Sequence, residues 1–167
     1  LPRLGGTLLP SSGGRLGPVP AGLEKISGKQ FEVVVDLDVT SPLRLLEDIC
    51  GAVKLLETKN ISNVITAAPA RRSPYFNLVE LGDNGVVRLS KPLKEAIARR
   101  QDSPKCFDMN ASIYIWNRQT LLKSFTAVLE REAKWKIIFY EMPPSRSIDI
   151  DSELDFKLVE FLLKGKK

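Results

Sequence analysis

The chain has 167 residues, 43% of them hydrophobic and 27% charged, which fits one globular domain of ordinary size. It contains no histidine, and this excludes imidazole catalysis, histidine metal ligands and a Ser-His-Asp triad. The net charge of +5 is spread along the chain, so we expect no nucleic-acid partner. No apolar run approaches the roughly 20 residues of a membrane span, and Cys50 and Cys106 stand alone, so we expect a reducing, cytoplasmic setting without membrane contact.

The first 22 residues differ in character from the rest of the chain. Residues 1–20 hold five Gly and four Pro with no acidic residue, so we interpret residues 1–22 as an irregular leader. A short helical stretch then ends at Gly28. Residues 31–38 are rich in valine, which predicts a strand in the middle of a parallel sheet. Residues 23–167 are therefore expected to form one α/β domain.

Polar residues follow this first strand. Thr40 or Ser41 can cap the next helix, and Pro42 suits the first position of that helix. Ligands of open α/β sheets bind at the carboxyl ends of parallel strands, next to helix starts. Asp38, Thr40 and Ser41 are thus placed to face a ligand, although ordinary loop and capping roles explain the same residues about equally well.

The remaining predicted elements alternate between strand and helix, with one interruption. The interruption is a hairpin and a short helix inserted into the mainly parallel sheet. In chain order the predictions are a strand over 63–68, a hairpin of 78–81 and 86–89 with Asn84-Gly85 at its turn, a helix over 92–100, a strand over 110–116, a helix over 120–130, a strand over 136–140, and a helix over 156–163 whose apolar face should pack on the sheet.

Asp149 and Asp151 alternate with isoleucines just before the last helix. In an extended segment, side chains two residues apart point to the same side, so the two carboxylates share one small volume. A hard divalent cation such as Mg²⁺ would relieve their repulsion. On spacing alone, a solvated strand end with Asp151 or Ser152 capping the helix is a slightly better explanation.

Four phrases in the same order resemble the family of CMP-N-acylneuraminate synthetases, which activate sialic acid and related ulosonic acids. The resemblance covers roughly residues 23 to 163 and implies a Rossmann-like nucleotidyltransferase fold that transfers CMP from CTP to the sugar acid and releases pyrophosphate. The phrases are Thr40-Ser41-Pro42-Leu43-Arg44, Arg100-Gln101 with Pro104, Asn110 before Ile113-Tyr114-Ile115, and Ser147-Ile148-Asp149-Ile150-Asp151 before Asp155-Phe156.

The resemblance also implies roles for individual residues. Asp149 and Asp151 would hold Mg²⁺ and so serve as the catalytic pair. Arg100 would bind the carboxylate of the sugar acid, and Gln101 and Asn110 would donate hydrogen bonds to the substrate. Family members use the hairpin and short helix, here about residues 74–105, to form a homodimer.

Two departures from the family pattern are visible. Family members begin with a strand and a Gly-rich basic loop that cradles the CTP phosphates, and neither Gly5-Gly6 nor Gly13-Gly14-Arg15 follows such a strand. The chain therefore resembles a member that lacks its first third, and this leaves its activity open. Asp38-Val39 stands where many members have Gln-Pro, so the preferred sugar is also open.

Two rival functions are compatible with the residues. Asp36 and Asp38 with Thr40 also match the Asp-x-Asp-x-Thr signature of haloacid dehalogenase-like phosphatases, in which the first Asp is the nucleophile. The later motifs of that family are not convincingly present. The other rival is a non-catalytic, dimerising remnant of a cytidylyltransferase.

Overall fold

The structure is a computed structural model that describes residues 19–93, 99–127 and 136–165. The chain divides into two compact units. The first unit comprises the described residues up to Ala67 and from Met109 onward, and the second comprises Ala68–Asp108. Among the described residues, no helix is long and apolar enough to cross a membrane.

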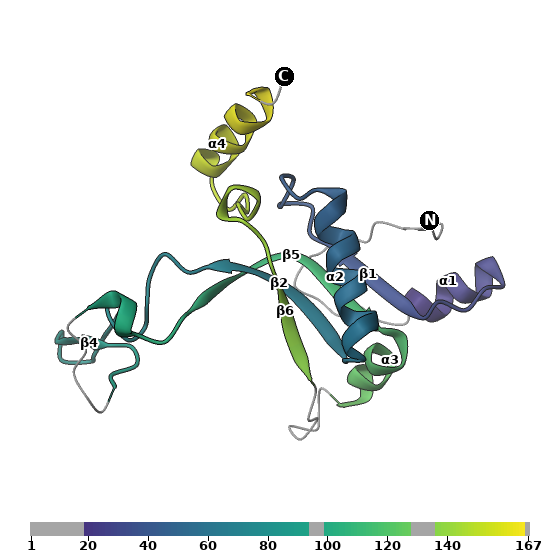
Figure 1. Ribbon diagram of the computed structural model, residues 1–167, viewed down its shortest axis with the longest axis horizontal. Helices are drawn as coiled ribbons and strands as arrows, with labels where there is room; N and C mark the ends of the chain where they lie inside the picture. The colour runs from purple at the N-terminus through teal and green to yellow at the C-terminus, as the bar shows by residue number, and fades with distance from the viewer. Residues whose placement is uncertain (1–18, 94–98, 128–135, 166–167) are drawn as a thin grey trace. The chain divides into compact units, whose positions relative to one another are not determined.

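The first unit is built on a four-stranded sheet in the order β1-β5-β2-β6 (Figure 1). β5 runs antiparallel to β1, and β2 runs parallel to β6. Between β5 and β2, the Asn63 amide donates to the Ile115 carbonyl and the Thr66 hydroxyl exchanges hydrogen bonds with the Ile113 backbone, so these two strands also run in opposite directions. The sheet is therefore mixed, with β5 reversed among three strands of one direction. The strands are β1 (Val33–Leu37), β2 (Asn63–Pro69), β5 (Phe107–Asn117) and β6 (Ile137–Glu141).

Helix α2 (Leu46–Lys59) packs on one face of this sheet and completes the core. Its Ala52 and Leu56 side chains are buried against Val64 of β2 and against Ile113 and Ile115 of β5. Alternate residues of a strand face the same side, and each of these strands contributes such residues to the core. The predicted core strands over 63–68 and 110–116 are thus confirmed.

Three further helices, α1, α3 and α4, belong to the first unit, and the first of them ends at a predicted glycine. Helix α1 (Val19–Ser27) ends at Gly28, whose φ of 64° is the left-handed conformation that glycine favours, as predicted. The helix also takes in the last residues of the predicted irregular leader, of which residues 1–18 lie outside the described residues. Helix α3 (Arg118–Ala127) follows β5 directly, and helix α4 (Glu153–Lys164) ends the described chain.

Three predictions about this unit are wrong. The strand predicted to be central, β1, lies at the edge of the described sheet. Helix α2 begins at Leu46 and not at Pro42, because the Asp48 carboxylate, rather than Thr40 or Ser41, accepts the Leu45 N–H at 2.9 Å and caps the helix.

The third error concerns α4, whose apolar face was expected to pack on the sheet. Only Val159 is buried among its residues, while Leu154 and Phe161 are about three-quarters exposed. Sequence periodicity identifies an apolar helix face but does not identify what covers that face.

The second unit contains a two-stranded antiparallel sheet, β3 (Val79–Leu81) and β4 (Val87–Leu89). Its turn is closed by a hydrogen bond from the Gly85 N–H to the Gly82 carbonyl at 2.9 Å, and Gly85 has a φ of 76°. The predicted hairpin with a turn at Asn84-Gly85 is confirmed. Most of the helix predicted over 92–100 lies outside the described residues, and Arg100–Asp102 form a single 3-10 turn, η1.

Candidate functional site

The carboxyl end of β1 carries the first predicted ligand-facing residues. The Asp38 carboxylate accepts hydrogen bonds from the Thr40 N–H at 3.0 Å and from the Thr40 hydroxyl at 2.7 Å. The Asp38 N–H donates to the Ser112 carbonyl at 3.2 Å. These bonds close a tight turn immediately after β1, so the side chains of Asp38 and Thr40 are fixed relative to the sheet.

A second segment, after β6, meets this turn. The Ser41 hydroxyl, which is buried, donates to the Asp149 carboxylate at 3.3 Å. The Ile150 N–H donates to the Thr40 carbonyl at 3.0 Å and also lies 3.1 Å from the Asp149 carboxylate. The structure therefore brings together Thr40, Ser41 and Asp149, which sequence analysis placed in two separate candidate sites.

Asn110 joins the same neighbourhood from β5. Its amide nitrogen donates to the Ser147 hydroxyl at 2.9 Å, and its amide oxygen accepts the Ser112 N–H at 3.3 Å. Ala111, between these two residues, has a φ of 51°, which is the left-handed conformation that residues with a Cβ rarely adopt. The Asn110 side chain thus spans a local irregularity of β5 and is largely buried.

The site is electrostatically negative. Burial raises the pKa of the Tyr114 hydroxyl, and the carboxylates of Asp36, Asp38 and Asp149 raise it further. Burial, followed by the nearby Asp38 charge, raises the pKa of the Asp36 carboxyl. Clustered carboxylates disfavour one another's ionised forms, which agrees with the raised pKa values of Asp36 and Tyr114.

Arg44 supplies one positive charge beneath this cluster. Its Nη1 atom donates to the backbone carbonyls of Asp38, Ser41 and Ser112, the last two at 2.8 and 3.4 Å. Burial lowers the pKa of Arg44, while the Asp38 charge acts in the opposite direction. The guanidinium connects the turn after β1 to β5 through the backbone carbonyls that its Nη1 atom contacts.

Asp151 and Ser152 form the start of α4. The Ser152 hydroxyl accepts the Asp155 N–H at 3.3 Å and donates to the Asp155 carboxylate at 2.6 Å, so Ser152 is the predicted helix cap. Asp151 is exposed and is not needed for capping. Carboxylate oxygens of Asp149 and Asp151 are the donor type that Mg²⁺ prefers. In the described part of the chain, no group of three or more acidic or cysteine side chains is arranged to hold a metal ion.

Arg100 and Gln101 belong to the second unit. The Arg100 Nη2 atom donates to the carbonyls of Ala70 and Arg71 at 3.1 and 2.8 Å. Both hydrogen bonds use Nη2, and a guanidinium has further N–H groups on Nε and Nη1. The side chains of Arg100 and Gln101 are exposed.

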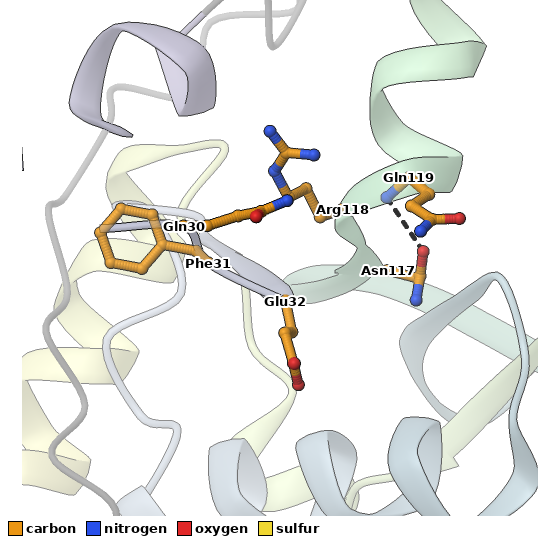
Figure 2. Close-up of a pocket in the computed structure, with 6 residues that line it drawn as sticks. All are labelled: Gln30, Phe31, Glu32, Asn117, Arg118 and Gln119. Carbon is orange, nitrogen blue, oxygen red and sulfur yellow. Dashed lines mark hydrogen bonds between the residues drawn. The ribbon is translucent and has the colours of Figure 1, made fainter. Parts of the chain in front are cut away.

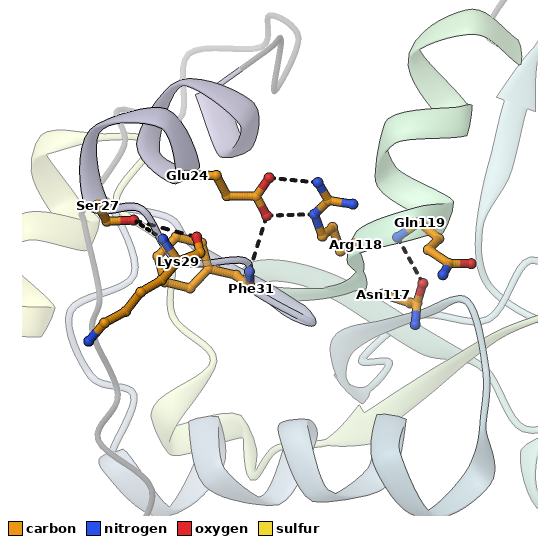
Figure 3. A network of polar contacts seen from close by, with 7 residues as sticks. All are labelled: Glu24, Ser27, Lys29, Phe31, Asn117, Arg118 and Gln119. Atoms are coloured by element: carbon orange, nitrogen blue, oxygen red, sulfur yellow. Dashed lines mark hydrogen bonds and ion pairs between the residues drawn. The ribbon is translucent and has the colours of Figure 1, made fainter.

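A depression of about 330 Å³ lies between the segment just before β1 and the junction of β5 with α3 (Figure 2). Its lining contains no predicted site residue and comes from Gln30, Phe31, Glu32, Asn117, Arg118 and Gln119. Beside it, the Glu24 carboxylate accepts two hydrogen bonds from Arg118, at 2.5 and 2.6 Å, and one from the Phe31 N–H at 3.1 Å (Figure 3). This network fastens α1 to β1 and α3 and leaves the Arg118 charge paired.

Sequence comparison gives the family. The chain is 44% identical over 137 residues to post-translational flagellin modification protein B of Campylobacter coli, and 46% identical over 136 residues to CMP-N,N'-diacetyllegionaminic acid synthase of Campylobacter jejuni. The chain is a partial member of the CMP-N-acylneuraminate synthetase family. These alignments cover 82% and 81% of the chain but only 55% and 54% of the relatives, so the chain spans about half of their length. No family model matches the chain.

More distant members and solved structures agree with this assignment. N-acylneuraminate cytidylyltransferase B of Danio rerio is 28% identical over 134 residues. The fold resembles 4-diphosphocytidyl-2C-methyl-D-erythritol synthase of Anaerococcus prevotii, with a TM-score of 0.58 over 86% of this chain and 64% of that one. It also resembles CMP:2-keto-3-deoxy-manno-octonic acid synthetase complexed with CTP, with a TM-score of 0.55 over 92% and 70%. At 14% and 12% identity these likenesses establish the fold, a Rossmann-like nucleotidyltransferase fold.

Sequence reasoning missed several residues that shape the site. Arg44 was part of the family phrase but was given no role, and Tyr114 was noted only as part of a strand. Asp48 and Arg146, which form a partly buried ion pair beside the site, were not considered. One sequence signal could have pointed to Asp48. It lies three residues after Leu45 at the start of an apolar helical pattern, which is a position from which a carboxylate can cap a helix.

Proposed function

We propose that the chain provides part of a cytidylyltransferase that transfers CMP from CTP to a sialic-acid-like ulosonic acid and releases pyrophosphate. The observation that supports this most directly is the meeting of the Thr40-Ser41 turn with Asp149 through the Ser41 and Ile150 hydrogen bonds. The proposal is further supported by the relatives reported above, whose names include a CMP-legionaminic acid synthase and a cytidylyltransferase.

In this proposal Asp149 and Asp151 hold Mg²⁺, and their hard oxygen atoms suit that ion. When bound, Mg²⁺ neutralises phosphate charge and lowers the pKa of the attacking sugar hydroxyl. Ser41 holds the Asp149 carboxylate in place, and Asp38 and Thr40 form a rigid rim beside it. Phosphoryl transfer needs little covalent help, so such positioning accounts for most of the protein's contribution.

The sugar acid would be recognised by Arg100, Gln101 and Asn110. Guanidinium groups bind carboxylates through paired N–H donors, which matches the acid group of an ulosonic acid. The Asn110 nitrogen already donates one N–H to Ser147 and lies 3.6 Å from Met142 Sδ, and its oxygen accepts the Ser112 N–H, so a substrate would displace one of these contacts or use the second lone pair of the oxygen. A homodimer formed through residues of about 74–105 and a cytoplasmic setting complete the proposal.

The dehalogenase-like alternative is not favoured by the reported relatives, whose names are those of CMP-sugar synthases and cytidylyltransferases. Asp36 is the last residue but one of β1 and pairs with Tyr114 of the neighbouring strand. The second alternative, a remnant that dimerises without binding nucleotide, is an outcome of the experiment below.

The test is calorimetric titration of the purified chain with CTP in the presence of Mg²⁺. We expect binding that is lost in the Asp149→Ala/Asp151→Ala variant, because the metal would lose both carboxylates, and that is retained in Asp36→Asn. Absence of CTP binding by the unsubstituted chain would contradict the proposal for this chain and leave the remnant alternative. Equal binding by the double variant would contradict the assignment of the metal ligands.

A further inference from the structure

An ion pair between the fully buried Asp48 and the partly buried Arg146 joins the start of α2 to the segment that carries Asp149. The Asp48 side chain is fully buried, and its Oδ1 accepts a hydrogen bond from Arg146 Nη2 at 2.8 Å. The other Asp48 oxygen accepts the Leu45 N–H at 2.9 Å. Glu47 lies 3.2 Å from Arg146 Nη1 but is 65% exposed, so solvent weakens that second pair.

Arg146 ends the 3-10 turn η2 (Pro144–Arg146) and is three residues before Asp149. The chain from Arg146 to Asp149 can span only about 10 Å when extended, so the place of one residue restricts the place of the other. The hydroxyl of Ser147, the next residue, has two hydrogen-bond partners. It donates to the Pro143 carbonyl at 3.0 Å and accepts from the Asn110 amide at 2.9 Å.

The pair cannot be opened cheaply. Opening the pair would leave the fully buried Asp48 carboxylate with the Leu45 N–H in place of a charged partner, which is strongly unfavourable, so the pair favours an Arg146 side chain that stays beside Asp48. The first turn of α2 follows the Thr40-Ser41 turn along the chain, and that turn contacts Asp149 and Ile150 directly. The two segments are therefore joined at two places, by the Asp48–Arg146 pair and by the Ser41 and Thr40 hydrogen bonds.

We propose that Arg146, through its pair with Asp48, is a positioning residue that holds Asp149 against the turn after β1. The inference rests on the proposed function, because it assigns Arg146 to the metal-binding carboxylate of that site. Arg146 itself contacts neither metal nor substrate in this proposal. Its effect passes through the backbone of residues 147–149.

The test uses three variants of the full chain. Arg146→Met removes the charge and keeps an apolar side chain. Asp48→Asn/Arg146→Met also removes the carboxylate that would otherwise be buried alone, which protects the fold from that penalty. Glu47→Gln is the matched control, because it removes the exposed partner of the same guanidinium.

Two quantities are measured in each variant. Hydrogen exchange at the Ile150 amide, compared with amides of β2 and β5, reports whether the segment still rests on the Thr40 carbonyl. The paramagnetic signal of free Mn²⁺, used as a substitute for Mg²⁺, reports the metal affinity of the Asp149/Asp151 pair.

In both variants that lack Arg146, we expect the Ile150 amide to exchange at least tenfold faster and Mn²⁺ to bind at least fivefold more weakly. In the double variant, the exchange rates of the β2 and β5 amides should not change. Glu47→Gln should change either quantity by less than twofold. Unchanged Ile150 exchange, or exchange restored to the original rate in the double variant, would overturn the proposal. If the unsubstituted chain binds no Mn²⁺, the proposed function fails and this inference fails with it; if it binds Mn²⁺ and the Arg146 variants bind equally well, this inference alone fails.

Discussion

At the scale of single residues, the Glu24 carboxylate gives a prediction with a defined pH dependence. Hydrogen bonds from Arg118 and then from the Phe31 N–H lower the pKa of Glu24 below its ordinary value, while burial acts in the opposite direction. A carboxyl whose pKa is lower in the folded state stabilises the protein above its unfolded pKa, and this contribution is lost as the pH falls through the folded pKa. The stabilisation should therefore be complete at neutral pH and decline below about pH 4.

We accordingly expect Glu24→Gln to be less stable than the unsubstituted chain at pH 7, with the difference shrinking at pH 3.5. Urea unfolding at the two pH values measures this, through the midpoint at a constant slope. Glu32→Gln is the control, because Glu32 is exposed in the segment just before β1, and this substitution should change the stability little at either pH. A stability difference that is the same at pH 7 and pH 3.5 would show that the Arg118 pair has no electrostatic contribution.

At the scale of elements, the contact between α2 and β6 depends on one glycine. A Cβ atom at Gly51 would lie 2.6 Å from Cε2 of Tyr140 and 2.8 Å from its Cζ and hydroxyl oxygen. Tyr140 packs against the hydrophobic core, so its ring cannot move aside without disturbing core neighbours. Glycine inside a helix is otherwise about 1 kcal/mol less favourable than alanine.

Gly51→Ala should therefore destabilise the chain by about 1 to 3 kcal/mol, the usual range for overpacking, although helix propensity alone predicts the opposite sign. Gly22→Ala in α1 is the matched control, because no atom lies within 4 Å of its added Cβ, and it should be neutral or stabilising. Chemical unfolding of both variants measures the effect. Equal stabilisation by the two alanines would contradict the close approach of Tyr140.

The same elements explain what could be predicted from the sequence. Strands β2, β5 and β6 were found because each contains a short run of apolar residues, and the Gly82–Gly85 turn was found from its Asn-Gly pair. The start of α2 was misplaced because Thr40, Ser41 and Pro42 satisfy the local rules for a helix start. The Thr40 and Ser41 hydroxyls bind Asp38 and Asp149 instead, and the Asp149 contact lies 108 residues away along the chain.

The candidate site was predictable only as separate pieces for the same reason. Spacing paired Asp149 with Asp151, and the resemblance to the family gave this pair a metal role. The strand-end rule pointed to Thr40 and Ser41, and the family phrases added Asn110. Their meeting depends on hydrogen bonds between distant segments, which no local pattern reports. Asp48 and Arg146 carry no motif, and their importance follows from the burial of the Asp48 charge.

At the scale of the whole molecule, the unit formed by Ala68–Asp108 exposes apolar side chains that a single copy does not cover within the described residues. Leu81 is 74% exposed and Val87 is 59% exposed, and these two residues face each other across the β3–β4 pair. Neighbouring apolar side chains on a small sheet are typical of protein interfaces. Their position within residues 74–105 agrees with the part of the chain that we propose for homodimer formation.

We expect the purified chain to form a dimer and Leu81→Glu to weaken this dimer at least tenfold, which corresponds to about 1.4 kcal/mol, because a glutamate at the interface would be buried without a partner. Sedimentation velocity over a range of concentrations measures the equilibrium. Ile26→Glu is the control, since Ile26 is 86% exposed in α1 and belongs to the other unit, so this charge should leave the dimer intact. A chain that is monomeric at every concentration would refute the dimer. If both variants weaken the dimer equally, the interface lies elsewhere or the weakening comes from the added charge alone.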